Sequence, residues 1–221
     1  MTTLTRSEKA ESRPASTPAE PIVALTRRTI DSALIAIGAV ATVGFLVAAS
    51  LLAWGSNFAK DYVDDELSSQ NITFPAAAAL TTEGRADLVS FADEVVNTGP
   101  EAEAYAGYIN GHLQGIAGGA TFADLGATER AAKAAVETAR ARGASDSEIA
   151  TLQGKADAVS GQRNTLFKGE TLRGLLLTAF AWSTVGRIAG FAAIAAFAAG
   201  GIMLVLVLLG LRHHHKAVRL S

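Results

Sequence analysis

The chain contains no cysteine among its 221 residues. Disulfide bonds, thiol nucleophiles and thiolate metal sites are therefore excluded. Charged residues make up only 18% of the chain, and the formal net charge of −2 gives no support to nucleic-acid binding. The sequence also lacks a Gly-x-Ser-x-Gly motif, a phosphate-binding loop and a dinucleotide fingerprint, so we predict no catalytic and no cofactor-binding residues.

Charge is absent altogether from two long runs, Ala33–Trp54 and Ile188–Leu211, which have 22 and 24 residues. A bilayer core about 30 Å thick is crossed by roughly 20 apolar residues in a helix. We therefore predict transmembrane helices at residues 32–54 and 188–211 and a location in the plasma membrane. These runs argue against a wholly soluble enzyme.

The first 31 residues consist mainly of Ser, Thr, Pro, Ala and charged residues and show no apolar period. Such a composition buries too little surface to offset the entropy of ordering, so residues 1–31 are predicted to be a disordered arm. A cleaved signal peptide is the alternative. Its apolar region would have only about 7–15 residues, so the longer run favours an uncleaved anchor.

Basic residues lie at the end of each run that is farther from the middle segment. Arg27 and Arg28 precede the first run, and residues 212–221 form a basic tail after the second, whereas residues 55–187 hold 11 basic and 17 acidic residues. Because basic residues mark the cytoplasmic side, we predict cytoplasmic termini and an extracytoplasmic middle segment, with the lipid bilayer as a partner. The predicted interface anchors are Trp54, Trp182 and Arg187.

The middle segment, residues 55–171, is predicted to be a helical domain. Apolar residues follow helical spacing over 88–96, over 105–116 and from Ser145 to about Leu166. Ser145 with Glu148 three residues later is the pattern of a capping box, which predicts that the last of these helices starts at Ser145. Residues 128–142 are Ala-rich and charged, which is typical of a helix with a thin apolar face. No window alternates with period two, so the predicted fold class is an all-α membrane protein. Two transmembrane helices flank its extracytoplasmic helical domain.

The apolar stretch 172–187 lies between Arg173 and Arg187 and is too short for a span of its own. It is either an outward continuation of the second membrane helix, back to about Thr171, or a helix lying flat in the interface. If it continues the membrane helix, we expect Phe58 and Tyr62 on the first helix to face it.

Several short motifs follow one another along the chain: Val96-Asn97-Thr98-Gly99, Ala104-Tyr105-Ala106, His112-Leu113, Ile116-Ala117-Gly118-Gly119, Thr121-Phe122 and Leu166-Phe167-Lys168-Gly169-Glu170-Thr171-Leu172-Arg173-Gly174. Together, over roughly residues 35–212, the chain resembles a group of actinobacterial two-span membrane proteins of unknown function. These are often labelled "aromatic ring-opening dioxygenase LigA". The resemblance implies an actinobacterial cell-membrane protein and brings no established activity with it.

The ring-opening label can be judged by its chemistry. Extradiol cleavage needs non-haem Fe(II) held by two histidines and one carboxylate. The chain has four histidines, of which His213, His214 and His215 are consecutive in the tail and His112 lies in the middle segment. This distribution does not supply the ligand set, so we predict no metal ligands and no enzymatic activity.

His112 stands on the apolar face of the helix predicted over 105–116. Its charge can change near neutral pH, so it is a candidate proton switch. The alternative, which we favour, is a hydrogen-bonded histidine in the core, because the sequence identifies no carboxylate partner.

Small residues recur in both membrane runs, a pattern that lets helix backbones approach closely in lipid. The predicted packing residues are Ala192, Ala196 and Gly200 on the second helix and Gly38, Gly44 and Ala48 on the first. The pattern predicts a packed helix pair, either within one chain or between copies in a homo-oligomer.

Two classes of function follow from this organisation. The first is a non-enzymatic interaction or accessory subunit of an envelope or respiratory complex. The second is a membrane-anchored sensor or ligand-binding module that takes a small ligand in its helical outer domain. Neither class involves nucleic acid.

Overall fold

The structure, a computed structural model, describes residues 27–219 and the side chains of residues 29–213. Its elements are α1 (Arg27–Ser68), α2 (Ala77–Thr82), the 3-10 helix η1 (Ala86–Phe91), α3 (Gly99–Gly115), the 3-10 helix η2 (Ile116–Gly119), α4 (Phe122–Ala141) and α5 (Asp146–Arg219). The described residues form no strand, and a single antiparallel bridge joins Thr73 to Val95. The predicted all-α fold class is therefore confirmed.

The predicted arm overlaps only partly with the described residues. Residues 1–26 lie outside them, whereas residues 27–31 already belong to α1. In the tail, residues 212–219 continue α5, and residues 220–221 lie outside the described part.

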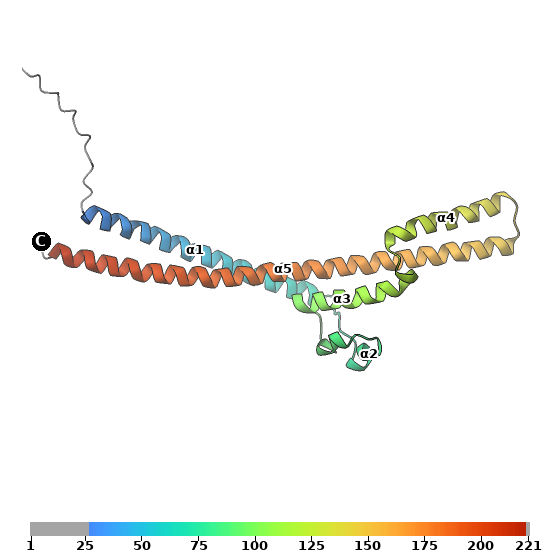
Figure 1. Ribbon diagram of the computed structural model, residues 1–221, viewed down its shortest axis with the longest axis horizontal. Helices are drawn as coiled ribbons and strands as arrows, with labels where there is room; N and C mark the ends of the chain where they lie inside the picture. The colour runs from blue at the N-terminus through green and yellow to red at the C-terminus, as the bar shows by residue number, and fades with distance from the viewer. Residues whose placement is uncertain (1–26, 220–221) are drawn as a thin grey trace, which may run out of the picture.

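Helix α5 is the axis of the molecule. Its 74 residues correspond to about 110 Å at 1.5 Å per residue. Three helices run alongside it in turn, with α4 at its beginning, α3 at its middle and α1 along its last part (Figure 1). The protein is therefore an elongated rod, with residues 69–145 folded against the half of α5 that comes first in the chain.

The length of α5 corrects one expectation. We expected one helix from Ser145 to about Leu166 and another from about Thr171, but the structure has a single unbroken helix. The five prolines of the chain all lie outside α1 and α5, and no Gly-Gly pair separates residues 166 and 172. The stretch 172–187 is thus continuous with the apolar residues after it. The start is as expected, since the Glu148 N–H donates to Ser145 Oγ at 3.3 Å.

A second expectation, a helix over 88–96, is wrong. The chain there forms η1, which ends at Phe91, and then runs extended, with the Val96 N–H donating to the Ile72 carbonyl at 2.8 Å. Thr98 and Glu101 then form a capping box at the start of α3. The Thr-Gly-Pro-Glu sequence therefore starts a helix, as a Thr N-cap followed by proline favours.

The main apolar cluster joins the middle segment to both long helices. Phe74, Leu80 and Val96 are almost fully buried in it, and Val63 of α1 and Leu176 of α5 belong to the same cluster. A smaller cluster consists of Leu113, Leu125 and Leu166. The middle segment and the rod therefore share one core and do not form separate units.

Helix α4 packs on the beginning of α5 through a partly buried polar cluster. The Glu129 carboxylate, whose side chain is only 12% exposed, accepts hydrogen bonds from Lys133, Ser160 and Arg163 at 2.8 Å each. The Arg163 guanidinium also lies 4.0 Å from the centre of the Phe122 ring. The hydrogen bonds, first that from Lys133 and then that from Ser160, lower the pKa of Glu129 to about 2.

We predict that this cluster makes stability depend on acid. The pKa of Glu129 falls from an ordinary 4.5 to about 2 on folding, so its stabilisation is complete above pH 4.5 and is lost as pH falls toward 2. In circular-dichroism melts of the purified chain, Glu129→Gln should lower the melting temperature at pH 7. The difference from wild type should shrink steadily below pH 4.5.

Glu137→Gln is the matched control, because Glu137 is largely exposed and pairs only with Arg140 on its own helix. Glu137→Gln should change the melting temperature little at any pH. A Glu129→Gln effect equal at pH 7 and pH 2.5 would contradict the role assigned to this carboxylate.

Candidate functional site

Helices α1 and α5 pack closely against each other along most of α1. A Cβ added at Gly38 would lie 2.8 Å from Val207 Cγ2, and one added at Gly186 would lie 2.9 Å from the Cβ of Ala59. Neither position has room for a side chain, so the two backbones approach each other through glycine. Thr42 is also buried here, and its hydroxyl donates to the Gly38 carbonyl at 2.8 Å.

The two helices run antiparallel in one register. Gly38 faces Val207, Gly200 faces Leu46, Gly190 faces Ser56 and Gly186 faces Ala59. On α5 the buried positions at Gly186, Ala193, Gly200 and Val207 recur every seven residues. A repeat of seven keeps two helices in contact when they coil around each other with a left-handed twist.

Some of the predicted packing residues lie in this contact between α1 and α5, the seam, and others lie on the exposed surface. Gly38 and Gly200 are buried in the seam, and Ala196 is half-buried beside it. Gly44, Ala48 and Ala192 are exposed, so they lie outside the helix pair that forms within this chain. Steps of four residues turn 40° around a helix, so a row of every fourth residue leaves the contact, whereas the seven-residue repeat stays in it. Within this chain, α1 and α5 form a packed pair.

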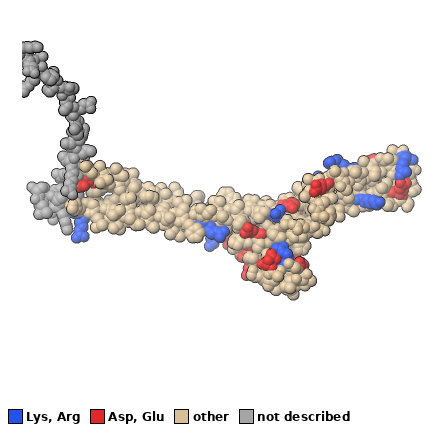
Figure 2. All heavy atoms as spheres, viewed as in Figure 1, with Lys and Arg blue, Asp and Glu red and all other residues tan. Residues whose placement is uncertain are grey.

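Charged residues bound the apolar part of the pair at both ends. On α1 the uncharged stretch extends from Asp31 to Lys60, about 43 Å, and on α5 from Arg187 to Arg212, about 37 Å. A bilayer with its headgroups is about 40–45 Å thick. Both helices are long and apolar enough to cross a membrane. Figure 2 shows this part of the rod as an uncharged surface, with Lys or Arg atoms where the rest of the molecule begins.

The predicted interface anchors lie near the end of the uncharged stretch that adjoins the middle segment. Trp54, Trp182 and Arg187 are all exposed. Trp54 begins a stacked row of rings along α1, with centroids 5.7 Å apart to Phe58 and 6.0 Å onward to Tyr62.

The expectation that Phe58 and Tyr62 face α5 is wrong, because both are more than half exposed. Ala59, Val63 and Leu67, which lie on the neighbouring face of α1, are buried instead. Tyr62 and Trp182 border an open apolar groove of about 310 Å³ between α1 and α5.

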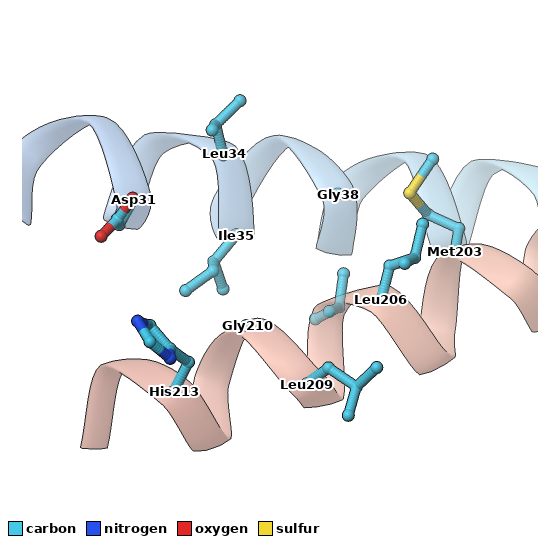
Figure 3. Close-up of a pocket in the computed structure, with 10 residues that line it drawn as sticks. Asp31, Leu34, Ile35, Gly38, Met203, Leu206, Leu209, Gly210 and His213 are labelled. Carbon is cyan, nitrogen blue, oxygen red and sulfur yellow. The ribbon is translucent and has the colours of Figure 1, made fainter. Parts of the chain in front are cut away.

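A cavity of about 430 Å³ lies at the other end of the pair, between the beginning of α1 and the end of α5. Gly38 and Gly210 line it, and Leu34, Leu206 and Met203 contribute apolar walls. Figure 3 shows Asp31 and His213 pointing toward each other from the two helices at the mouth of the cavity. The cavity therefore combines apolar walls with one acidic and one imidazole group.

His112 lies on the surface of α3, not in the core. Its side chain is 54% exposed, its Nδ1 lies 3.2 Å from the Tyr108 carbonyl oxygen, and its Nε2 lies 3.7 Å from Glu83 Oε2. The residues of α3 that are buried are Gly99, Ala102, Ala106 and Leu113, so the prediction of a core histidine is wrong. The carboxylate partner that the sequence did not identify is Glu83, which lies 29 residues earlier, just after α2.

This surface cluster forms an open cavity of about 360 Å³ that Arg85 and Tyr108 also line. Burial, followed by the Glu83 carboxylate, raises the pKa of the Tyr108 phenol. Arg85 is held by Asp87, with Nη2 2.9 Å from Oδ2, and donates to the Gly107 carbonyl at 3.0 Å. The cluster is therefore a set of hydrogen-bonding and titratable groups on an accessible face.

The two histidines with described side chains lie far apart. His112 shares a surface cavity with Leu172 of α5, and His213 follows Leu172 by 41 residues, or about 60 Å along the helix. They cannot ligate the same ion within one chain. Over the described residues, no three His, Cys, Asp or Glu side chains are grouped as metal ligands.

Comparisons of the chain with protein-family models, with curated proteins and with solved structures find no match.

The register of the helix pair predicts a specific disulfide. A Cβ at position 190 would lie 3.7 Å from the Cβ of Ser56, within the usual range of about 3.5–4.5 Å for a disulfide. The chain has no native cysteine, so a Ser56→Cys/Gly190→Cys variant should oxidise to one intrachain bond. Trypsin cuts after Lys60 and Arg187, and mass spectrometry should find the two flanking peptides linked.

The control pair is Gly55→Cys/Gly190→Cys, because no atom of α5 lies within 4 Å of a Cβ at position 55. It should stay reduced under the same conditions. Equal oxidation of both pairs, or linkage found only between chains, would show that the register is wrong.

Proposed function

We propose that the protein is an integral membrane protein in which α1 and α5 cross the bilayer as an antiparallel hairpin. Both termini are then cytoplasmic, and residues 69–145, with the beginning of α5, stand outside. The spacing of the bounding charges supports the hairpin, because it matches the thickness of a bilayer with its headgroups. The basic residues before the uncharged stretch of α1 and after that of α5 support the orientation.

Its role is that of a non-enzymatic interaction or accessory protein, and the observation that carries this proposal is the unbroken course of α5. The 42 residues from Asp146 to Arg187 precede the uncharged stretch in the same helix and extend about 60 Å from it. A helix that is continuous from the membrane to the tip holds α4 at a fixed distance from the bilayer. Such a stalk presents a surface to another protein, whereas a reaction on a small molecule needs no such reach.

The open character of the outer cavities favours the same role. Catalytic sites usually lie in concave pockets that bury most of the substrate. The cavity at His112 lies on the surface between the end of α2 and α3, and the groove at Tyr62 is open along the rod. Neither is lined by a serine or cysteine nucleophile.

A sensor or ligand-binding role is the second candidate, and the His112–Glu83 pair is the observation that favours it. An exposed imidazole 3.7 Å from a carboxylate can change its interactions on protonation. The neighbouring Arg85 and Tyr108 offer donors to a small anionic or polar ligand.

Topology is the first test of the hairpin. Ser145 lies just before α5, between α4 and α5 at the far tip, and a cysteine there should react with a membrane-impermeant maleimide in intact spheroplasts. Cysteines at Ser7 and Ser221 should react only after the membrane is opened. The opposite pattern, with both ends labelled and Ser145 protected, would reverse the orientation.

Purification in mild detergent separates the two roles. An accessory protein should elute with other subunits in a fixed stoichiometry that survives further size-exclusion chromatography. A sensor should elute alone and show a ligand-dependent rise in melting temperature that is lost in His112→Ala and kept in His213→Ala. A lone protein with no such ligand response would count against both roles.

A further inference from the structure

A cavity of about 520 Å³ lies where α1, α5 and the beginning of α3 meet. Its volume is within the range of about 300–1,000 Å³ found for ligand pockets. A Cβ at Gly99 would overlap the side chain of Ser183, so the glycine lets the start of α3 approach α5 and close this side. The residues that line the cavity are Ser56, Lys60, Val63, Asp64, Asn97, Thr98, Gly99, Pro100, Ser183, Gly186 and Arg187.

Five polar side chains of this lining have no hydrogen bond or ion pair within the part of the chain that the structure describes. They are Ser56, Lys60, Asn97, Ser183 and Arg187.

The free hydroxyls differ from others on the same helices. Thr42 and Ser50 of α1 and Thr178 of α5 each donate to the carbonyl four residues earlier, at 2.8–2.9 Å. Ser56 and Ser183 therefore keep their donors available to a group in the cavity.

Two acidic groups nearby, one of which lines the cavity, already accept hydrogen bonds. The Asp64 carboxylate accepts a hydrogen bond from Ser68, one turn farther along α1, at 3.2 Å. Glu101 accepts from the backbone N–H groups of Asn97 and Thr98 at 2.8 and 2.9 Å. Lys60 and Arg187 are thus two cations without a carboxylate partner beside a cavity of hydrogen-bond donors, which is an arrangement suited to an anion.

The cavity lies at the boundary of the uncharged stretch. Gly186 faces Ala59 in the helix pair, so Lys60 and Arg187 stand at the same level. Each is the first charged residue beyond its uncharged stretch, and Trp54 precedes Lys60 by six residues, or about 9 Å along α1. In the hairpin of the proposed function, on which this step rests, the cavity is at the depth of the lipid headgroups.

We propose that this cavity binds the phosphate group of an anionic phospholipid. Lys60 and Arg187 pair with the phosphate oxygens, and the hydroxyls of Ser56 and Ser183 donate to the same oxygens or to the headgroup. The acyl chains follow the apolar surface of α1 and α5 toward the bilayer centre. A zwitterionic lipid binds less well, because its own ammonium competes for the phosphate. A free phosphate shares the chemistry but is not delivered by the membrane.

Native mass spectrometry of the full chain released from nanodiscs tests this site. With phosphatidylglycerol and phosphatidylcholine in equal amounts, wild type should retain phosphatidylglycerol preferentially. Lys60→Gln/Arg187→Gln should retain at least about threefold less, while Lys60→Arg/Arg187→Lys keeps most of the binding. The matched control is Arg130→Gln/Lys155→Gln, which removes one exposed Arg and one exposed Lys from α4 and the far part of α5 and should behave as wild type.

Each other result overturns the proposal. Equal retention by wild type and Lys60→Gln/Arg187→Gln shows that the two cations hold no lipid, and equal retention of both lipids shows no anionic selection. Displacement of the bound lipid by millimolar inorganic phosphate identifies the free ion as the ligand. If no variant, the control included, incorporates into nanodiscs, the hairpin itself has failed, an outcome that is distinct from failure of this site.

Discussion

The close packing of α1 on α5 is the contact on which the rest of the structure depends. In an apolar surrounding, no hydrophobic force drives two such helices together, and the attraction comes from many short van der Waals contacts. Gly38, Gly186 and Gly200 make those contacts possible because each lies where a side chain would meet an atom of the opposite helix. The register of α1 against α5 also determines which charged residues of the two helices lie opposite each other. It places Lys60 beside Arg187 and Asp31 opposite His213.

The middle segment depends on this pair for its own core. Val63, Leu67 and Leu176 belong to the long helices, yet they are buried together with Phe74, Leu80 and Val96 of the middle segment. A segment with so many alanines has few large apolar side chains, and the long helices supply part of what is missing. A substitution that disturbs the packing of α1 on α5 therefore also disturbs the core of the middle segment, because both depend on the same two helices.

Cavities lined by charged or titratable side chains lie at three places along this rod. They are the cavity at Asp31 and His213, the boundary at Lys60 and Arg187, and the surface around His112 and Glu83. Only the last stands well away from the uncharged stretch. The first two bracket it, which relates them to the bilayer in the hairpin that we propose. The stalk formed by the beginning of α5 then sets the distance between the membrane and the far tip at α4.

The sequence by itself determined the helical class, the two apolar runs and their charged boundaries, because these depend on local composition and on helical period. It also identified the seam residues Gly38 and Gly200. Only the tertiary structure decided which face of each helix is buried: Phe58 is exposed and Ala59 is buried one residue later, a rotation of 100° that apolar character alone does not predict. The same holds for Glu83 beside His112 and for Glu129 between Lys133, Ser160 and Arg163. Most of these pairs are separated by about 30 residues and by turns, so packing brings them together where spacing along the chain could not.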